Sequence, residues 1–496
     1  GTSTGTTTGI DGEYLIKVSG NDAILQFSYI GYSQVAEKVA GRRVLNVTMK
    51  PSAEALEEVV VVGSGTQKKV SVTGSISTIS GDALRMPSTT LTRALGGRIA
   101  GVITKQNSGE PGTGADFYIR GISTFGGKTT PLILLDDVEI TATDLNYIPA
   151  ENIASFTVLK DASATAIYGA RGANGVMIVT TKGGEFNSKT KINISVENSF
   201  NFINKAPDLV GGVDMMNFYN WVNEARNPGS PALFSQEKIE RTASRINPLL
   251  YPDVDWKSEL LRDVAMRQRA NFNVSGGSSK IRYYMSLDAQ HENGLQNSDS
   301  YYSWNNNQQV YNYTFQNNIS YKATRTTTLS LNMNTQIRQQ SGPNCTSEWL
   351  ISILGENCNP VDFPVYWPAG PNGEIRYGTK KFSDKISFTN PKYELNSTYK
   401  QANYTTVNTV LKLDQQLDFI TKGLKLNAWV NWKSYSSMSF NRAITPYLYH
   451  FIVDDGFDLD TPIEPEIVNK DANQFITDSG ITRGSNNTFE FQANLN

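Results

Sequence analysis

The chain has 496 residues and is almost neutral, with 45 basic against 47 acidic side chains and a formal net charge of -2. This balance offers no basic field for a nucleic-acid backbone, and two cysteines with two histidines are too few for metal clusters, so we expect no nucleic-acid partner, no metal and no cofactor. No apolar run of 18 or more residues occurs, which excludes transmembrane helices but not transmembrane strands, because strands expose only every second side chain to lipid.

Residues 1–50 alternate Gly and Asp turns with strand-forming runs at 13–18, 23–29 and 44–49, which is typical of a small β-sandwich. The wording GTSTGTTTGIDGEYLIKV and FSYIGY resembles the carboxypeptidase-regulatory-like module. That module's first strand is expected upstream of Gly1, so we predict an N-terminally incomplete sandwich and a processed or truncated end. We expect no enzyme, because no His/Glu zinc pair occurs in this module.

Residues 51–69 form a predicted linker that contains LEEVVVVGSGTQKK. Two glutamates and a Gly-Ser-Gly hinge bound a valine run that has strong strand propensity and no local partner. Such a segment is suited to pair with the edge of another protein's sheet, although an ordinary edge strand is the alternative. The residues of this predicted strand are Glu57, Glu58, Val59, Val60, Val61, Val62 and Gly63.

Residues 70–184 read as an α+β domain with many glycines. It carries LTRALGGRIAGV, then FYIRG, and ends in LKDASATAIYGARGANGVMIVTTKGG. In the last motif, Asp161 or Ser163 can cap a short helix, Gly169 and Gly172 permit tight turns, and Asn174-Gly175 is a turn signal before a β-branched strand. These motifs closely resemble the plug domain of SusC/RagA-type TonB-dependent transporters of the bacterial outer membrane.

The resemblance implies three kinds of partner. Residues 57–65 resemble the family's TonB box, which the periplasmic C-terminal domain of TonB is expected to capture by strand addition. The family also implies a SusD-like surface lipoprotein over the barrel and an oligosaccharide or peptide substrate. The N-terminal module and the TonB box are then expected to lie in the periplasm.

Two polar, glycine-rich plug loops, 107–114 and 123–130, are predicted to face the substrate cavity, since plug loops do so in the family. Plain connecting loops are the alternative. The predicted substrate-binding residues are Ser108, Glu110, Thr124, Phe125 and Lys128.

Charged residues elsewhere in the plug receive a structural interpretation. Arg98, Arg120, Arg171 and Asp161 are expected to pair within the plug or with the barrel wall rather than with ligand. Asp137 stands where the family usually has a turn glycine, and the turn is expected to survive because aspartate tolerates left-handed geometry.

Residues 185–496 hold strands whose side chains alternate between apolar and polar, which predicts one apolar face and one wet face. Their connections alternate between long and short, as in outer-membrane barrels with long extracellular loops and short periplasmic turns. The eight predicted strands occupy 192–200, 270–276, 281–288, 311–321, 329–338, 407–419, 424–433 and 488–496.

Eight strands are too few to enclose a plug, since a barrel of about eight strands has room only for its own side chains. Complete plugged transporters have about 22 strands, so we expect this chain to hold the N-terminal part of a transmembrane antiparallel β-barrel. Alternation that continues to Asn496 supports this expectation.

Cys345 and Cys358 lie in one long predicted extracellular loop. An oxidising cell surface favours a disulfide between them, with two unpaired thiols as the alternative.

Together these features predict TonB-dependent active import of an oligosaccharide or peptide across the bacterial outer membrane. A passive surface-binding protein or adhesin, or a porin with a fixed plug, is the alternative. A peptidase, suggested only by the name of the first module, lacks a ligand set in that module.

Overall fold

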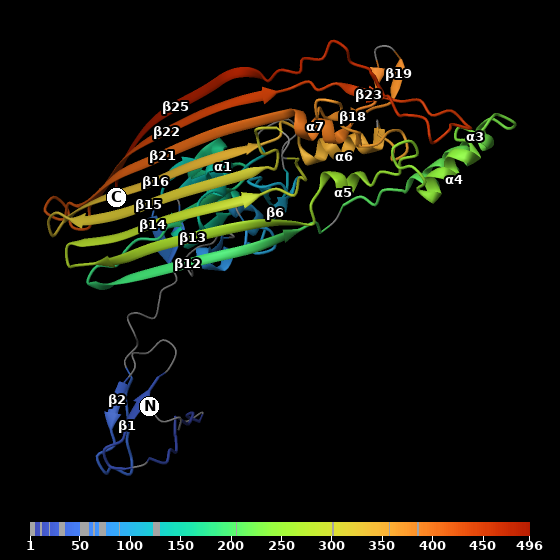
Figure 1. Cartoon of the computed structure of the whole chain (residues 1–496). Helices are drawn as coiled ribbons and strands as arrows, with labels where there is room; N and C mark the ends of the chain where they lie inside the picture. The colour runs from blue at the N-terminus through green and yellow to red at the C-terminus, as the bar shows by residue number, and fades with distance from the viewer. Residues whose placement is uncertain are drawn as a thin grey trace.

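The structure is a computed structural model in which residues 5–9, 12–18, 20–28, 35–49, 59–62, 65–68, 76–88, 90–122, 129–204, 206–299, 302–356, 358–383 and 386–496 are described. A curved sheet of long strands, a smaller domain against one face of that sheet, and helices at one end of the strands make up most of the molecule (Figure 1). Within the described residues, no helix is long and apolar enough to cross a membrane.

The N-terminal module contains one antiparallel hairpin, β1 (Ile24–Phe27) with β2 (Val35–Lys38). The predicted strand at 23–29 is present as β1, but 13–18 and 44–49 join no ladder among the described residues, so these two strand predictions are wrong. Tyr14 still bridges them, since its hydroxyl donates to the Leu45 carbonyl at 2.8 Å. A strand-forming run needs a paired neighbour to become a ladder, and propensity alone does not supply one.

The valine run is β3 (Val59–Val62), and it pairs antiparallel with β4 (Gly65–Lys68). The prediction that this run lacks a local partner is therefore wrong, because the glycine-rich hinge is short enough to bring β4 beside it. In a two-stranded hairpin, every second residue of β3 still directs its backbone groups away from β4. Glu57, Glu58 and Gly63 lie outside the described residues.

The plug is built on a five-stranded sheet whose central strands are buried on both faces, which explains their continuous apolar sequences. Pairing is antiparallel except between β11 and β8, which run parallel. The strand order is β5 (Ile76–Ser80), β10 (Ile153–Leu159), β11 (Val176–Thr181), β8 (Leu132–Leu135) and β9 (Val138–Ile140).

Short helices and a second hairpin cover this sheet. The hairpin pairs β6 (Val102–Lys105) with β7 (Asp116–Ile119). The main core of the plug lies between these elements and one sheet face, with Phe156, Met177 and Leu145 fully buried. The helical segments are η2 (Gly81–Leu84), η3 (Leu91–Ala94), α1 (Ala142–Asn146), η4 (Ala150–Asn152), α2 (Ala162–Thr165) and η5 (Ala166–Gly172).

The turn predictions within the plug are confirmed. Gly169 and Gly175 have positive φ values of 55° and 87°, in the region that favours glycine. Asp136 and Asp137, between β8 and β9, have φ values of 48° and 81°, so aspartate does hold the left-handed turn. Asp161 occupies the N-cap of α2, but its side chain makes no cap hydrogen bond.

The wall is one eight-stranded sheet in which every neighbouring pair is antiparallel and consecutive. All eight predicted strands are confirmed, and each observed strand extends beyond the predicted range at one end or both. The wall strands are β12 (Ser188–Phe202), β13 (Val264–Gly277), β14 (Ile281–Asn293), β15 (Gln309–Lys322), β16 (Thr327–Gly342), β21 (Thr398–Gln416), β22 (Lys425–Ala443) and β25 (Thr477–Leu495).

The two faces of the wall are reversed relative to a soluble sandwich. On the convex face, Ile194 and Val196 are 72% and 80% exposed, whereas polar residues such as Asn271 and Gln316 are buried beside the plug. Large exposed apolar patches mark interaction surfaces, and a band of apolar side chains on the outside of a curved antiparallel sheet is the lipid face of a membrane barrel. The sheet is therefore part of a transmembrane β-barrel with a polar interior.

Long connections leave the wall at one end, and short turns close the other end (Figure 1). We call the helices and small sheets of the long connections the outer-loop layer. Its helices are α3 (Gly212–Arg226), α4 (Gln236–Ser244), α5 (Trp256–Leu260), α6 (Ser347–Glu356) and α7 (Pro391–Ser397). Its strands are β17 (Tyr366–Trp367), β18 (Arg376–Gly378), β19 (Lys381–Ser383), β20 (Ile386–Ser387), β23 (Leu448–His450) and β24 (Glu466–Ile467).

A tight junction joins plug and wall. A side chain at Gly184 would meet the backbone of β14 at the Tyr283 carbonyl, 2.3 Å from an added Cβ, and β13 at the Gly276 carbonyl, 2.6 Å away. Only glycine fits this close approach of three chain segments. The close contacts of Gly184 with β13 and β14 therefore fix the direction in which the chain passes from the plug into β12.

Candidate functional site at the plug and wall interface

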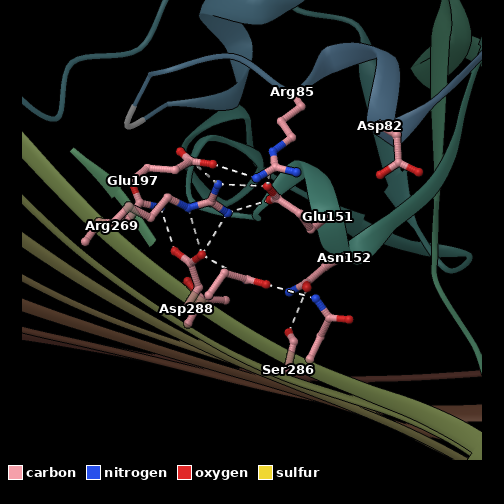
Figure 2. Close-up of polar contacts among 12 residues, drawn as sticks. Asp82, Arg85, Glu151, Asn152, Glu197, Arg269, Ser286 and Asp288 are labelled. Atoms are coloured by element: carbon pink, nitrogen blue, oxygen red, sulfur yellow. Dashed lines mark hydrogen bonds and ion pairs between the residues drawn. The ribbon is translucent and has the colours of Figure 1, made fainter. Parts of the chain in front are cut away.

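A group of opposite charges joins the plug to the inner face of β12, β13 and β14 (Figure 2). We call it the plug–wall ion cluster. Its members are Arg85 and Glu151 of the plug and Glu197, Arg267, Arg269 and Asp288 of the wall. Strand pairing places the wall members together, since Glu197 lies directly opposite Arg269 in the register of β12 with β13.

Glu151 lies between two guanidinium groups (Figure 2). The two terminal nitrogens of Arg269 donate to its two carboxylate oxygens at 2.9 and 2.5 Å, and Arg85 Nε lies 2.9 Å from Oε1. Arg269 Nε also donates to Asp288 at 2.8 Å. A bidentate pair of this kind fixes direction as well as distance, so it holds η4 of the plug in one position on β13.

The centre of this cluster is shielded from water. The side chains of Arg269, Glu151 and Asp288 are only 5%, 9% and 1% exposed. Burial alone would raise the pKa of Glu151, but hydrogen bonds and charge attraction from Arg269 outweigh it and lower that pKa. Glu151 is therefore ionised at neutral pH while the plug is in place.

Uncharged hydrogen bonds extend this contact along η4 and the neighbouring strand. Tyr284 and Ser286 of β14 donate through their hydroxyls to Asn152 Oδ1 at 3.0 and 2.7 Å. Further along the wall, Thr314 donates to the Tyr147 carbonyl at 3.0 Å and Asn318 donates to Thr181 Oγ1 at 2.7 Å. The plug and wall therefore meet through hydrogen bonds as well as ion pairs.

A second charged contact lies on β21 and β22. Lys433 Nζ is 2.5 Å from Asp144 Oδ2, and Lys412 Nζ is 2.7 Å from Asp137 Oδ2. The Arg338 guanidinium lies over the rings of Tyr147 and Tyr404, with centroid distances of 4.6 and 4.1 Å. Polar contacts thus hold the plug from β12 to β22.

The chemistry of this site suits attachment of the plug to the wall. Its carboxylates are paired with arginine or lysine, and no described group of three or more His, Cys, Asp or Glu residues is arranged to hold a metal ion. A contact made of charges and hydrogen bonds can be exchanged for water at low cost when it opens, whereas an apolar contact cannot. The interface is therefore suited to reversible attachment.

Two of the predicted substrate residues are engaged in contacts within the protein. Ser108 Oγ accepts from the Glu110 backbone N–H at 3.0 Å, and Glu110 Oε1 accepts from the Ser347 backbone N–H at 2.6 Å. The other three, Thr124, Phe125 and Lys128, lie outside the described residues. Substrate binding by all five stays a prediction.

The structural interpretation of the remaining plug charges is confirmed. Arg120 pairs with Asp161 at 2.6 Å, Arg171 pairs with Glu139, and Arg98 donates to the Ala83 carbonyl at 2.5 Å. All of these contacts are internal to the plug.

The predicted disulfide is absent, since Cys345 and Cys358 are both free thiols. They flank α6, whose ten residues separate its two ends by about 15 Å, whereas a disulfide requires Cα atoms within about 7 Å of each other. Each thiol packs into a different apolar cluster, Cys345 beside Leu350 and Cys358 beside Trp256. The helix between the cysteines is the feature that the sequence interpretation missed.

Both thiols are expected to resist alkylation by iodoacetamide at pH 8 in the native protein. Burial raises the pKa of Cys345 to about 12 and also raises the pKa of Cys358, so the reactive thiolate is scarce at this pH. Intact mass should increase by two adducts after denaturation without reductant. Thiols that become reactive only after reduction would instead indicate a disulfide.

The plug–wall ion cluster was not predicted from the sequence, although part of its signal was visible. Glu197 and Asp288 belong to the polar face predicted for their strands, and charged residues facing a barrel interior need partners. Glu151 carries no such periodic signal, because η4 is a single turn that follows Pro149.

Comparison with known proteins matches two segments of the chain to protein families. Residues 68–176 match the TonB-dependent Receptor Plug Domain, and residues 1–61 match the CarboxypepD_reg-like domain. A TonB-dependent receptor of Formosa agariphila is 34% identical over 299 residues, which are 60% of this chain and 29% of that receptor. TonB-dependent receptor SusC of Bacteroides thetaiotaomicron is 34% identical over 303 residues, 60% of this chain and 28% of SusC.

The chain thus spans less than a third of the length of these two relatives, 29% and 28%. Among solved structures, the RagAB peptide importer in its open-open state superposes with a TM-score of 0.60 at 19% identity, over 78% of this chain and 43% of that chain. The RagAB peptide transporter gives the same TM-score of 0.60 over 75% of this chain. At this identity the likeness shows a shared fold.

A plug held by polar contacts against the inner face of a membrane-barrel wall defines a plugged outer-membrane receptor. The matched plug family and the two relatives narrow that class. Over the matched segments the chain is similar to TonB-dependent receptors, SusC among them, and it shares their plug domain.

Proposed function

We propose that this chain serves in TonB-dependent import of a nutrient across the bacterial outer membrane. The observation that carries the proposal is the polar, ion-paired contact between plug and wall, exemplified by Glu151 and Arg269. Such a contact keeps the plug in place at rest and can be broken by a pulling force without exposing apolar surface. It therefore suits a gate that opens repeatedly.

Energy for opening would enter through β3. We propose that TonB adds a strand to the edge of β3 on the side away from β4 and pulls, with the force drawn from the inner-membrane proton gradient. The TonB-binding residues remain those predicted, Glu57 to Gly63, of which Val59, Val60, Val61 and Val62 form β3. The N-terminal module and this strand would lie on the periplasmic side.

The long connections would then face the cell exterior, with a SusD-like surface lipoprotein above them. The RagAB structures are described as a peptide importer and a peptide transporter, which supports a peptide as one substrate class. An oligosaccharide is the other class proposed. Predicted contacts from Ser108, Glu110, Thr124, Phe125 and Lys128 belong to this proposal.

The proposal is tested by uptake of fluorescent peptide and oligosaccharide pools into cells that express the complete protein. We expect uptake to stop when the proton gradient is dissipated with an uncoupler or when TonB is deleted, while surface binding persists. Uptake that continues under both conditions would favour a porin. Surface binding without uptake under energised conditions would favour an adhesin with a fixed plug.

A further inference from the structure

A charge-assisted hydrogen bond joins the plug to the outer-loop layer, between segments far apart in sequence. Glu110, at the tip of a plug loop, accepts from the backbone N–H of Ser347 at 2.6 Å. Ser347 is the first residue of α6, where backbone N–H groups lack partners within the helix. A carboxylate also complements the positive end of the helix dipole, so the plug supplies a cap to a helix of the outer-loop layer.

On the plug side, this loop is tied firmly to the plug body. Arg93 of η3 donates to the carbonyls of Ser108 and Glu110 at 3.3 and 3.0 Å and to Thr113 Oγ1 at 2.6 Å. Tyr147 donates through its hydroxyl to the Gly112 carbonyl at 2.7 Å. A displacement of Glu110 would therefore be transmitted to η3 and to the residues after α1.

On the outer side, α6 is packed on its neighbours and reaches into the layer. Leu350 is buried against Leu260 of α5 and Leu395 of α7. At the far end of α6, Leu354 lines a cavity of about 520 Å³ together with Met215 and Tyr219 of α3. The helix thus spans about 15 Å between that cavity and the plug.

We propose that the contact of Glu110 with Ser347 couples the position of α6 to the position of the plug loop. Movement of the outer-loop layer would change the plug, and movement of the plug would release the start of α6, since coupling between two sites is reciprocal. The use of this coupling in import rests on the proposed function. The coupling itself is a property of the protein at rest and is measured without transport.

Hydrogen exchange of the purified complete protein tests the coupling from both sides. Ser347→Pro removes the donor, while proline is tolerated at the first position of a helix. It should speed exchange of the Thr113 amide, which bonds the Glu110 carbonyl at 3.2 Å. Glu110→Ala should likewise speed exchange at Leu350 in α6, and each change should be roughly tenfold, as expected for loss of a hydrogen bond to a charged group.

Two further variants keep the experiment decisive. Glu110→Gln retains a neutral acceptor and should give a smaller change, and it replaces Ser347→Pro if the proline variant does not fold. Glu348→Gln removes the neighbouring acid in the first turn of α6 and should leave Thr113 unchanged. Unchanged exchange at Thr113 in Ser347→Pro and at Leu350 in Glu110→Ala would overturn the coupling.

The two proposals fail separately. Uptake that continues without a proton gradient would contradict the proposed import function but would not affect the hydrogen-exchange result. Normal energy-dependent uptake, together with unchanged hydrogen exchange in all variants, would contradict the proposed coupling and leave the import proposal intact.

Discussion

Replacing Glu151 by alanine is expected to weaken attachment of the plug to the wall by about 3–5 kcal/mol, because it removes two hydrogen bonds between buried charged groups, each worth about 1.5–3 kcal/mol. Arg269 would remain almost fully buried, with a side chain only 5% exposed, and would retain Asp288 but lose two hydrogen bonds from its terminal nitrogens. Arg85 would lose one of its two carboxylate partners. The plug of this variant should therefore detach from the wall at a much lower urea concentration.

The measurement is the urea concentration at which a protease begins to cut the plug in detergent-solubilised protein. Asp82→Ala is the matched control, because Asp82 also belongs to the plug and pairs with Lys182 at 2.9 Å, but its side chain is 68% exposed. Exposed ion pairs contribute less than about 1 kcal/mol, so the control should barely change the urea concentration at which cleavage begins. Equal shifts in the two variants would remove the special role of the plug–wall ion cluster.

The same pair predicts a dependence on pH. The pKa of Glu151 is lowered from its ordinary 4.5 when the plug is attached, so the ionised form favours attachment. This contribution is fully present above the ordinary pKa and is lost as the pH falls through the lower value of the attached state. Glu151→Gln should remove this acid dependence, which the protease assay measured across acidic pH would detect.

Deleting residues 57–65 is expected to abolish energised uptake in cells that express the complete protein. The deletion removes β3, and strand addition by several main-chain hydrogen bonds implies that affinity for a purified TonB C-terminal domain falls roughly 100-fold or more. Protease resistance of the plug should stay normal, since the plug–wall ion cluster lies elsewhere. Undiminished uptake would rule out coupling through this segment.

A pair of proline variants refines this test. Val60 and Val61 lie opposite Gln67 and Thr66 in the hairpin, and adjacent residues direct their N–H groups to opposite sides of β3. Proline removes the donor at one position, so Val60→Pro and Val61→Pro should differ in TonB affinity. Equal affinities for both variants, close to that of the unaltered protein, would contradict strand addition at this edge.

The wall strands were predictable because each one must present apolar side chains to lipid on one face and polar side chains to the barrel interior on the other. Ile194 beside Ser195 and Val196 beside Glu197 show this alternation in the middle of β12. The left-handed turn at Asp137 was predictable from local chemistry, because only a few residue types tolerate that backbone. Such features depend on near neighbours in the chain.

The ion cluster and the cysteine environment were not predictable for the opposite reason. Glu151 and Arg269 are 118 residues apart, and their meeting depends on how the plug settles against the wall. The free thiols depend on α6, a helix inside a connection that has few sequence signals of its own. Properties set by the meeting of distant segments require the folded structure.

The junction at Gly184 limits how far the plug can travel. Six residues separate the end of β11 at Thr181 from the start of β12 at Ser188. Even fully extended, this connection spans only about 20 Å. β11 lies inside the plug sheet, whereas β5, the strand nearest in sequence to the pulled segment, is at its edge. A pull from the N-terminal side would therefore separate β5 from β10 first. The plug would then unfold progressively while β11 stays in place, rather than leave the barrel as one folded domain.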